Sequence, residues 1–66
     1  MEIVINGESQ QVPAPLSVVE LLRWLDLQGD RIAVELNREI LRRDQWAATH
    51  LKDQDHLEIV RFVGGG

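Results

Sequence analysis

The 66-residue chain contains no cysteine. The sequence therefore has no disulfide framework, no thiolate metal site and no cysteine nucleophile. Aromatic side chains are also scarce, with two tryptophans, one phenylalanine and no tyrosine. A chain of this length buries only about 60% of the surface that its unfolded form exposes. We therefore expect one small domain of marginal stability.

Basic residues are few. The chain has seven Lys and Arg residues and eleven Asp and Glu residues, which gives a formal net charge of −4. Nucleic-acid-binding domains usually carry a basic stripe, so the composition argues against nucleic acid as a partner. An acidic surface is compatible with a basic protein partner, although it is more often simply a soluble surface. No leader-like segment and no apolar run of about 20 residues is visible. We therefore expect a cytoplasmic protein without a membrane partner.

The first third of the chain predicts a β-hairpin. Residues 2–6 are short and β-branched, and Asn6-Gly7 is a strong hairpin signal because both positions tolerate positive φ. A return strand is expected over residues 8–12. Pro13 lacks a backbone donor, so this strand should lie at a sheet edge or stop there.

A helix is predicted next. Ser17 and Glu20 form the capping-box pattern S-x-x-E, in which each side chain satisfies a free amide at the helix start. The helix should run over residues 18–27, and Gly29 is a suitable stop. Its apolar residues recur at helical spacing and should form the buried stripe: Val18, Leu21, Leu22 and Leu25.

The second half predicts further strands around short turns. In order these are a strand over 32–36, a turn over 37–39, a short strand over 40–41, a helical turn over 43–48, a polar turn over 52–55 and a last strand over 57–63. One helix cannot cover both faces of a sheet. We therefore expect an α+β fold of the β-grasp, or ubiquitin-like, type, with a mixed sheet of four to five strands around one helix. Its first and last strands should pair in parallel at the centre. Residues 1–63 would form this domain and residues 64–66 a flexible tail.

Strand alternation predicts which side chains face the helix. Ile3, Ile5, Leu57 and Ile59 should point toward it, and Val4, Val60 and Phe62 away from it. Apolar residues on an uncovered sheet face are either half-buried by neighbours or form a partner surface. Val60 and Phe62 are therefore candidate docking residues, and packing at the sheet edge is an equal alternative for Phe62.

The sequence ends in Gly64, Gly65 and Gly66. Glycine loses the most backbone entropy on ordering, so a frayed end or an expression scar is one interpretation. The other is a tail of about 10 Å that threads into a narrow site of another protein. Its distinctive group would be the Gly66 α-carboxylate, which is ionised at neutral pH and must be activated, for instance as an acyl-adenylate. The chain has no G-x-x-x-x-G-K-[ST] loop, so a partner, and not this chain, should bind ATP.

Taken over its whole length, the chain resembles the ThiS family, the sulfur carrier proteins of thiamine biosynthesis. The likeness rests on the EIVING opening, the LSVVELL helix and the LEIVRFVGGG end. It also rests on a middle segment that contains Asn37, Ile40, Arg43 and Trp46. Two departures are the Asp53-Gln54-Asp55 loop, where relatives often carry Gly-Asp, and a third glycine where two suffice.

This resemblance implies a cycle of modification at Gly66. An E1-like adenylyltransferase would use ATP to form an acyl-adenylate, and a sulfurtransferase or cysteine desulfurase relay would supply sulfur for a C-terminal thiocarboxylate. Thiazole synthase would then take the sulfur, while Gly64 and Gly65 serve to thread the tail. The chain would be a protein co-substrate, not an enzyme, and monomeric when free. Two alternatives are the small subunit of molybdopterin synthase, which is usually longer, and a noncovalent β-grasp binding module with an incidental tail.

Several other residues have a structural and a functional interpretation. Trp24 and Trp46 are expected to pack in or beside the core and not to act as partner hot spots. Two histidines and two aspartates lack the spacing of a known metal site, so solvated turns and no bound metal are expected. These four are His50, Asp53, Asp55 and His56. Three arginines are expected to be ordinary surface residues: Arg38, Arg42 and Arg43.

Overall fold

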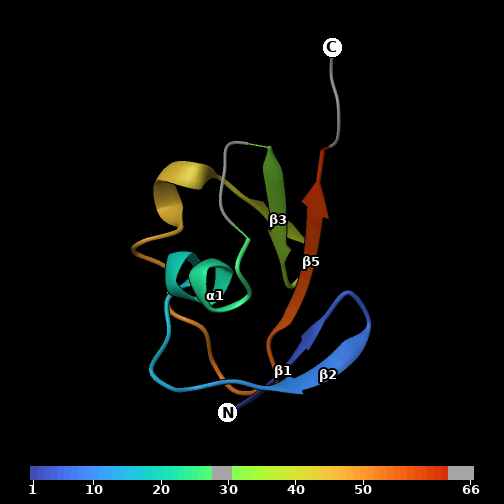
Figure 1. Cartoon of the computed structure of the whole chain (residues 1–66), viewed down its shortest axis with the longest axis vertical. Helices are drawn as coiled ribbons and strands as arrows, with labels where there is room; N and C mark the ends of the chain where they lie inside the picture. Colours follow the sequence, from blue (N-terminus) through green and yellow to red (C-terminus); the bar gives the residue numbers. More distant parts are fainter. Residues whose placement is uncertain (28–30, 63–66) are drawn as a thin grey trace.

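The structure is a computed structural model that describes residues 1–27 and 31–62. Its elements are β1 (Glu2–Ile5), β2 (Glu8–Gln11), α1 (Val18–Trp24), β3 (Ile32–Leu36), β4 (Glu39–Leu41), the 3-10 helix η1 (Arg43–Gln45) and β5 (His56–Arg61). In this part of the chain the strands form one five-stranded sheet in the order β2-β1-β5-β3-β4. Figure 1 shows α1 and η1 together on one side of this sheet.

The centre of the sheet is the predicted pair of first and last strands. β1 and β5 run parallel, with Val4 opposite His56 and Ile5 opposite Leu57. The β1–β2, β3–β4 and β3–β5 pairs are antiparallel. The mixed β-grasp sheet is therefore confirmed, and β2 lies at an edge as the following proline predicted.

Both hairpins turn through two residues with left-handed backbone. Asn6 and Gly7 have φ of 51° and 82°, and Asn37 and Arg38 have φ of 51° and 72°. Positive φ at both central residues defines the type I′ turn, whose twist matches that of the flanking strands. The second turn is one residue shorter than predicted, because Glu39 already belongs to β4.

The asparagines of these turns also fasten the central strand β5, a role that the sequence analysis did not predict. The Asn6 Oδ1 accepts the Ile59 amide at 2.8 Å, and the Asn6 Nδ2 donates to the Ile59 carbonyl at 3.2 Å. The Asn37 Oδ1 accepts the His56 amide at 3.0 Å. Each hairpin turn therefore anchors β5 through a side chain as well as through the ladder.

Helix α1 begins at the predicted capping box. The Ser17 Oγ accepts the Glu20 amide at 3.2 Å, and the Glu20 carboxylate accepts the Ser17 amide at 2.8 Å. The hydrogen bonds from the backbone and side chain of Ser17 lower the pKa of Glu20 below its ordinary value. The reciprocal cap explains why the prediction of the helix start is confirmed.

The helix ends earlier than predicted. Asp26 adopts φ 60°, and the Leu27 amide donates to the Leu22 carbonyl at 2.7 Å. This is the Schellman arrangement, in which a left-handed residue terminates the helix. Aspartate takes the place usually held by glycine because its short polar side chain tolerates that conformation. The predicted stop at Gly29 lies outside the described residues.

The core lies between α1 and the facing side of the sheet. Its most deeply buried side chains are Ile3, Val18, Leu21, Val34 and Leu57, each below 2% exposure. Ile5, Leu22 and Ile59 are buried too, while Leu25 is only partly buried against them. The predicted helix-facing strand residues are thus confirmed.

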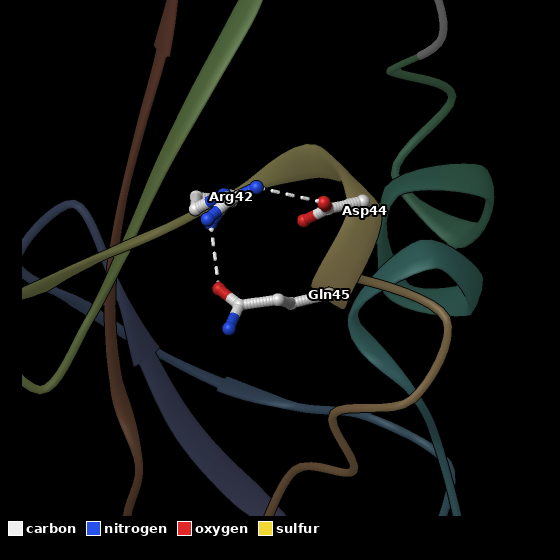
Figure 2. A network of polar contacts seen from close by, with 3 residues as sticks. All are labelled: Arg42, Asp44 and Gln45. Atoms are coloured by element: carbon white, nitrogen blue, oxygen red, sulfur yellow. Dashed lines mark hydrogen bonds and ion pairs between the residues drawn. The ribbon is translucent and has the colours of Figure 1, made fainter.

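The 3-10 helix η1 is stabilised by local polar contacts. The Arg42 amide donates to the Gln45 Oε1 at 3.1 Å, and the Arg42 guanidinium pairs with the Asp44 carboxylate at 3.0 Å (Figure 2). Both partners of this ion pair are mostly exposed, so its contribution to stability is small. The network orients the segment that leads into Trp46.

The two tryptophans differ. Trp46 is buried, its Nε1 donates to the Leu41 carbonyl at 3.1 Å, and the Arg43 guanidinium lies 4.7 Å from its ring centroid. Its predicted place in the core is confirmed. Trp24 is 49% exposed, so the same prediction is wrong for it. At about 100° per residue, its position falls outside the stripe of buried helix residues.

Candidate functional site

The face of the sheet opposite α1 is the candidate site. We call it the open face and define it by residues that alternate outward on the strands: Val4, Ala33, Glu35, Ile40, His56, Glu58, Val60 and Phe62. Three large apolar side chains on it are exposed: Ile40 by 78%, Val60 by 51% and Phe62 by 55%. A side chain that docks on a partner must be exposed in the free protein, and Val60 and Phe62 meet this condition.

The open face continues toward the C-terminal tail along β5. Glu58, Val60 and Phe62 follow one another on the same side of the strand, and the Phe62 amide donates to the Arg31 carbonyl at 2.8 Å. This bond extends the pairing with the β3 side of the sheet beyond Arg61. In Figure 1, β5 ends at the opposite end of the sheet from the β1–β2 hairpin. Gly64, Gly65 and Gly66 lie outside the described residues.

A shallow depression of about 640 Å³ lies at the other end of the open face. Its lining includes Val4, Glu35, Arg38, His56 and Glu58. The lining thus combines acidic, basic and apolar side chains. The sequence analysis named none of these residues as docking candidates. It also did not recognise Ile40 as an exposed residue of this face. Outward alternation was the available signal, but it does not say which outward residues become neighbours across strands.

Near the start of β1, several acidic side chains accept hydrogen bonds from backbone amides. The Asp53 carboxylate accepts the Glu2 amide at 2.7 Å, which lowers the pKa of Asp53. Hydrogen bonds from Ser9 and then Gln54 likewise lower the pKa of Glu2. The Asp55 Oδ2 accepts the Lys52 amide at 2.7 Å. These contacts hold the loop before β5 against the start of β1.

The four residues considered for metal binding are not brought together as a ligand set. Among residues 1–27 and 31–62, no group of three or more His, Asp or Glu side chains is placed to hold a metal ion. His50 forms an isolated bridge with Ser17 beside the helix start, and His56 lies on the open face. Within the same ranges, no helix has the length and apolar character needed to cross a bilayer.

Known proteins resemble this chain over its whole length. The family model described as the ThiS family matches residues 2–66. A sulfur carrier protein ThiS of Escherichia coli (strain K12) is 33% identical over 66 residues, covering 100% of both chains. A thiazole synthase of Paramagnetospirillum magneticum is 42% identical over all 66 residues, which make up 20% of that protein. The crystal structure of a thiamine biosynthesis protein (ThiS) from Geobacter metallireducens superposes with a TM-score of 0.86 at 40% identity, covering 100% of both chains.

Proposed function

We propose a complete carrier cycle for this chain, which belongs to the ThiS family and is a sulfur carrier protein of thiamine biosynthesis, not an enzyme. The working group of the cycle is the α-carboxylate of Gly66. The observation that carries this proposal is the match to the family over residues 2–66, which includes the glycine run. The cycle runs in the cytoplasm, and the chain enters it as a monomer.

The first step is activation by a partner. A carboxylate is a poor electrophile, so an E1-like adenylyltransferase joins the Gly66 carboxylate to AMP from ATP and releases pyrophosphate. The partner, and not this chain, binds the ATP. Gly64 and Gly65 allow the backbone to lie extended in the partner's narrow site, since neither residue has a Cβ atom. Ordering each costs about 1–2 kcal/mol, which contacts to the folded body must offset.

The second step exchanges oxygen for sulfur. The terminal sulfur of a persulfide supplied by a sulfurtransferase or a cysteine desulfurase relay attacks the acyl carbon, and AMP leaves. A second thiol of the relay then reduces the acyl disulfide and is itself oxidised to a disulfide. The product is a thiocarboxylate on Gly66, which agrees with a chain that has no cysteine to carry the sulfur. Thiazole synthase then takes the sulfur, and hydrolysis returns the carboxylate.

One relative, itself a thiazole synthase, supports thiazole synthase as a partner of this chain. The thiazole synthase of Paramagnetospirillum magneticum contains a segment 42% identical to this whole chain. Joining a carrier and its acceptor enzyme in one polypeptide raises their effective concentration, which benefits proteins that must meet. We therefore assign thiazole synthase as the sulfur acceptor of this chain.

Docking on the adenylyltransferase uses the tail-proximal part of the open face. Val60 and Phe62 are both about half exposed; Val60 lies on β5, and Phe62 directly follows the end of that strand. Apolar side chains in this place can be desolvated by a partner without disturbing the core, which lies on the opposite side of the sheet.

Intact mass measurement tests the cycle. Wild-type protein is incubated with the adenylyltransferase of the same genome, ATP and a sulfur source. A mass gain equal to one sulfur minus one oxygen, lost again on alkaline hydrolysis, is expected. Absence of this species with every adenylyltransferase of the cell, together with normal thiamine synthesis in a tail-deleted strain, contradicts the carrier cycle. The chain is then a noncovalent binding module.

A further inference from the structure

We propose that a groove between α1 and η1 binds a segment of the sulfur-delivering protein in which an apolar side chain stands beside a carboxylate. The inference rests on the proposed function, because it concerns the second step of that cycle. It adds a second docking surface, on the side of the sheet away from the open face. We call this surface the α1–η1 groove, and its lining residues include Val19, Leu22, Arg23, Leu27, Arg43 and Trp46.

The lining of the α1–η1 groove is mostly apolar and is held in place by the core. Leu22 is buried on the inner stripe of α1, and Trp46 is buried directly after η1. The Trp46 Nε1 donates to the Leu41 carbonyl at 3.1 Å, which holds the indole ring in one orientation. Val19 and Leu27 are only partly buried against the core. The groove therefore keeps apolar surface in water that a partner can cover.

The charged residues that line the groove are both arginines. Arg23 is exposed in the last turn of α1, and Arg43 is exposed in η1 with its guanidinium 4.7 Å from the Trp46 ring centroid. None of the described lining residues is acidic, although the chain has eleven Asp and Glu residues and only seven Lys and Arg residues. The groove is therefore a positive site on an acidic protein, and a negative group complements it.

Two acidic side chains near the groove in sequence are engaged elsewhere. The Glu20 carboxylate accepts the Ser17 amide at 2.8 Å at the start of α1. The Asp44 carboxylate pairs with the Arg42 guanidinium at 3.0 Å (Figure 2). A carboxylate of a partner is the fitting counter-charge for the groove, because the guanidinium fork matches a carboxylate through two parallel hydrogen bonds.

The volume of the groove indicates which kind of ligand fits. Sites for drug-sized molecules measure about 300–1,000 Å³, and the groove measures only about 240 Å³. It corresponds instead to a pocket for one anchoring side chain at a protein interface, where a few such anchors supply most of the binding energy. A leucine or phenylalanine of the partner would cover Leu22 and Trp46, and a neighbouring carboxylate would reach Arg23 or Arg43.

The position of the groove selects the partner. α1 and η1 lie together on one side of the sheet, and the open face is the other side (Figure 1). A protein can therefore bind the groove while the adenylyltransferase covers the open face. The second step of the cycle needs this arrangement, because an acyl-adenylate released into water would be hydrolysed before sulfur arrives. The sulfur-delivering protein must reach the carrier while the adenylyltransferase still holds it.

The groove also lies toward the end of the molecule at which β5 ends. Figure 1 shows η1 at this end of the sheet, away from the β1–β2 hairpin. A donor protein bound at the groove is thus on the same end of the carrier as Arg61, the last residue of β5. Both the side and the end of the molecule favour the sulfur-delivering protein as the occupant.

Two assays on the full chain test the inference. Carrier-dependent exchange of pyrophosphate into ATP measures adenylation. Intact mass measures thiocarboxylate formation with the persulfide-loaded protein of the same genome that thiolates wild-type carrier. Arg23→Glu reverses a charge in the groove, and Ala47→Leu narrows the groove at an exposed lining residue. Each variant should raise the donor concentration for half-maximal thiolation about tenfold or more, because an anchoring contact is lost. The kcat/KM for adenylation should stay within about twofold.

Three controls separate docking from chemistry and from folding. Lys52→Glu makes a matching charge reversal at an exposed residue outside the groove, and it should leave the donor requirement unchanged. Inorganic sulfide in place of the donor protein attacks the acyl carbon directly, and AMP leaves. Both groove variants should then form the thiocarboxylate at the wild-type rate. The urea midpoints of all three variants should stay close to that of wild type, because the substituted residues are exposed.

The inference is wrong if both groove variants need no more donor protein than Lys52→Glu. It is also wrong if they stay impaired with inorganic sulfide, since the defect then lies in the tail chemistry or in folding. A parallel fall in adenylation overturns it as well, because the groove then contacts the adenylyltransferase. Failure of the proposed function gives a different pattern: wild-type carrier then forms no thiocarboxylate with either source of sulfur.

Discussion

The side chain of Asn6 is expected to stabilise the fold by joining the first hairpin to the central strand. Replacing Asn6 by glycine removes both hydrogen bonds to the Ile59 backbone while keeping a residue that readily adopts φ near 51°. Each bond contributes about 0.5–1.5 kcal/mol net. The extra freedom of glycine in the unfolded chain costs a further fraction of a kcal/mol. We therefore expect Asn6→Gly to lose about 2 kcal/mol.

That loss is large for so small a domain. At about 0.05–0.15 kcal/mol per residue, a chain of this length has roughly 3–10 kcal/mol of stability. The expected loss lowers the thermal midpoint by about 8–16 °C. Urea unfolding followed by tryptophan fluorescence measures it directly, because Trp46 is buried in the native state.

Asn37→Gly is the matched control. Asn37 occupies the same turn position with the same φ of 51°, but its side-chain bonds to His56 and Asp55 are exposed. Water replaces such bonds more easily, so a loss below about 1 kcal/mol is expected. Equal losses in the two variants, or no loss in Asn6→Gly, would refute the reasoning that the partly buried bonds to Ile59 support the sheet.

Four further predictions concern the docking face, the tail and the helix cap. Phe62→Asp should raise the KM for adenylation while leaving the urea midpoint nearly unchanged, because Phe62 is 55% exposed; a steep fall in the midpoint would instead place Phe62 in the core. Gly65→Val should block adenylation without changing stability, since its β-branched side chain cannot enter a narrow channel. Deleting Gly66 leaves a Gly-Gly end about 3.5 Å short, and the intact mass after reaction shows whether two glycines suffice. The pKa of Glu20 is lowered from 4.5 in the folded state, so its contribution to stability is present above that pH and is lost as pH falls through the folded pKa. Glu20→Gln should therefore flatten the fall of the urea midpoint below about pH 4.5, and an unchanged pH profile would contradict the role of the cap.

Local chemistry in the sequence was sufficient for most of the fold. Asn6-Gly7 allows the left-handed backbone of a hairpin turn, and the Ser17/Glu20 pair satisfies amides within one helical turn. Alternation in the first and last strands assigned their inner and outer faces, and the core confirms the inner face. Each of these signals acts between residues close in sequence, so the chain determines it without help from distant parts.

Tertiary structure alone decided the features that join distant segments. Asn6 bonds Ile59 across 53 residues, and Glu35 meets Glu58 only because β3 and β5 take one particular register. Register and burial are set by how all the apolar faces fit around one helix. No local pattern contains that information, and the composition of the docking face follows from it.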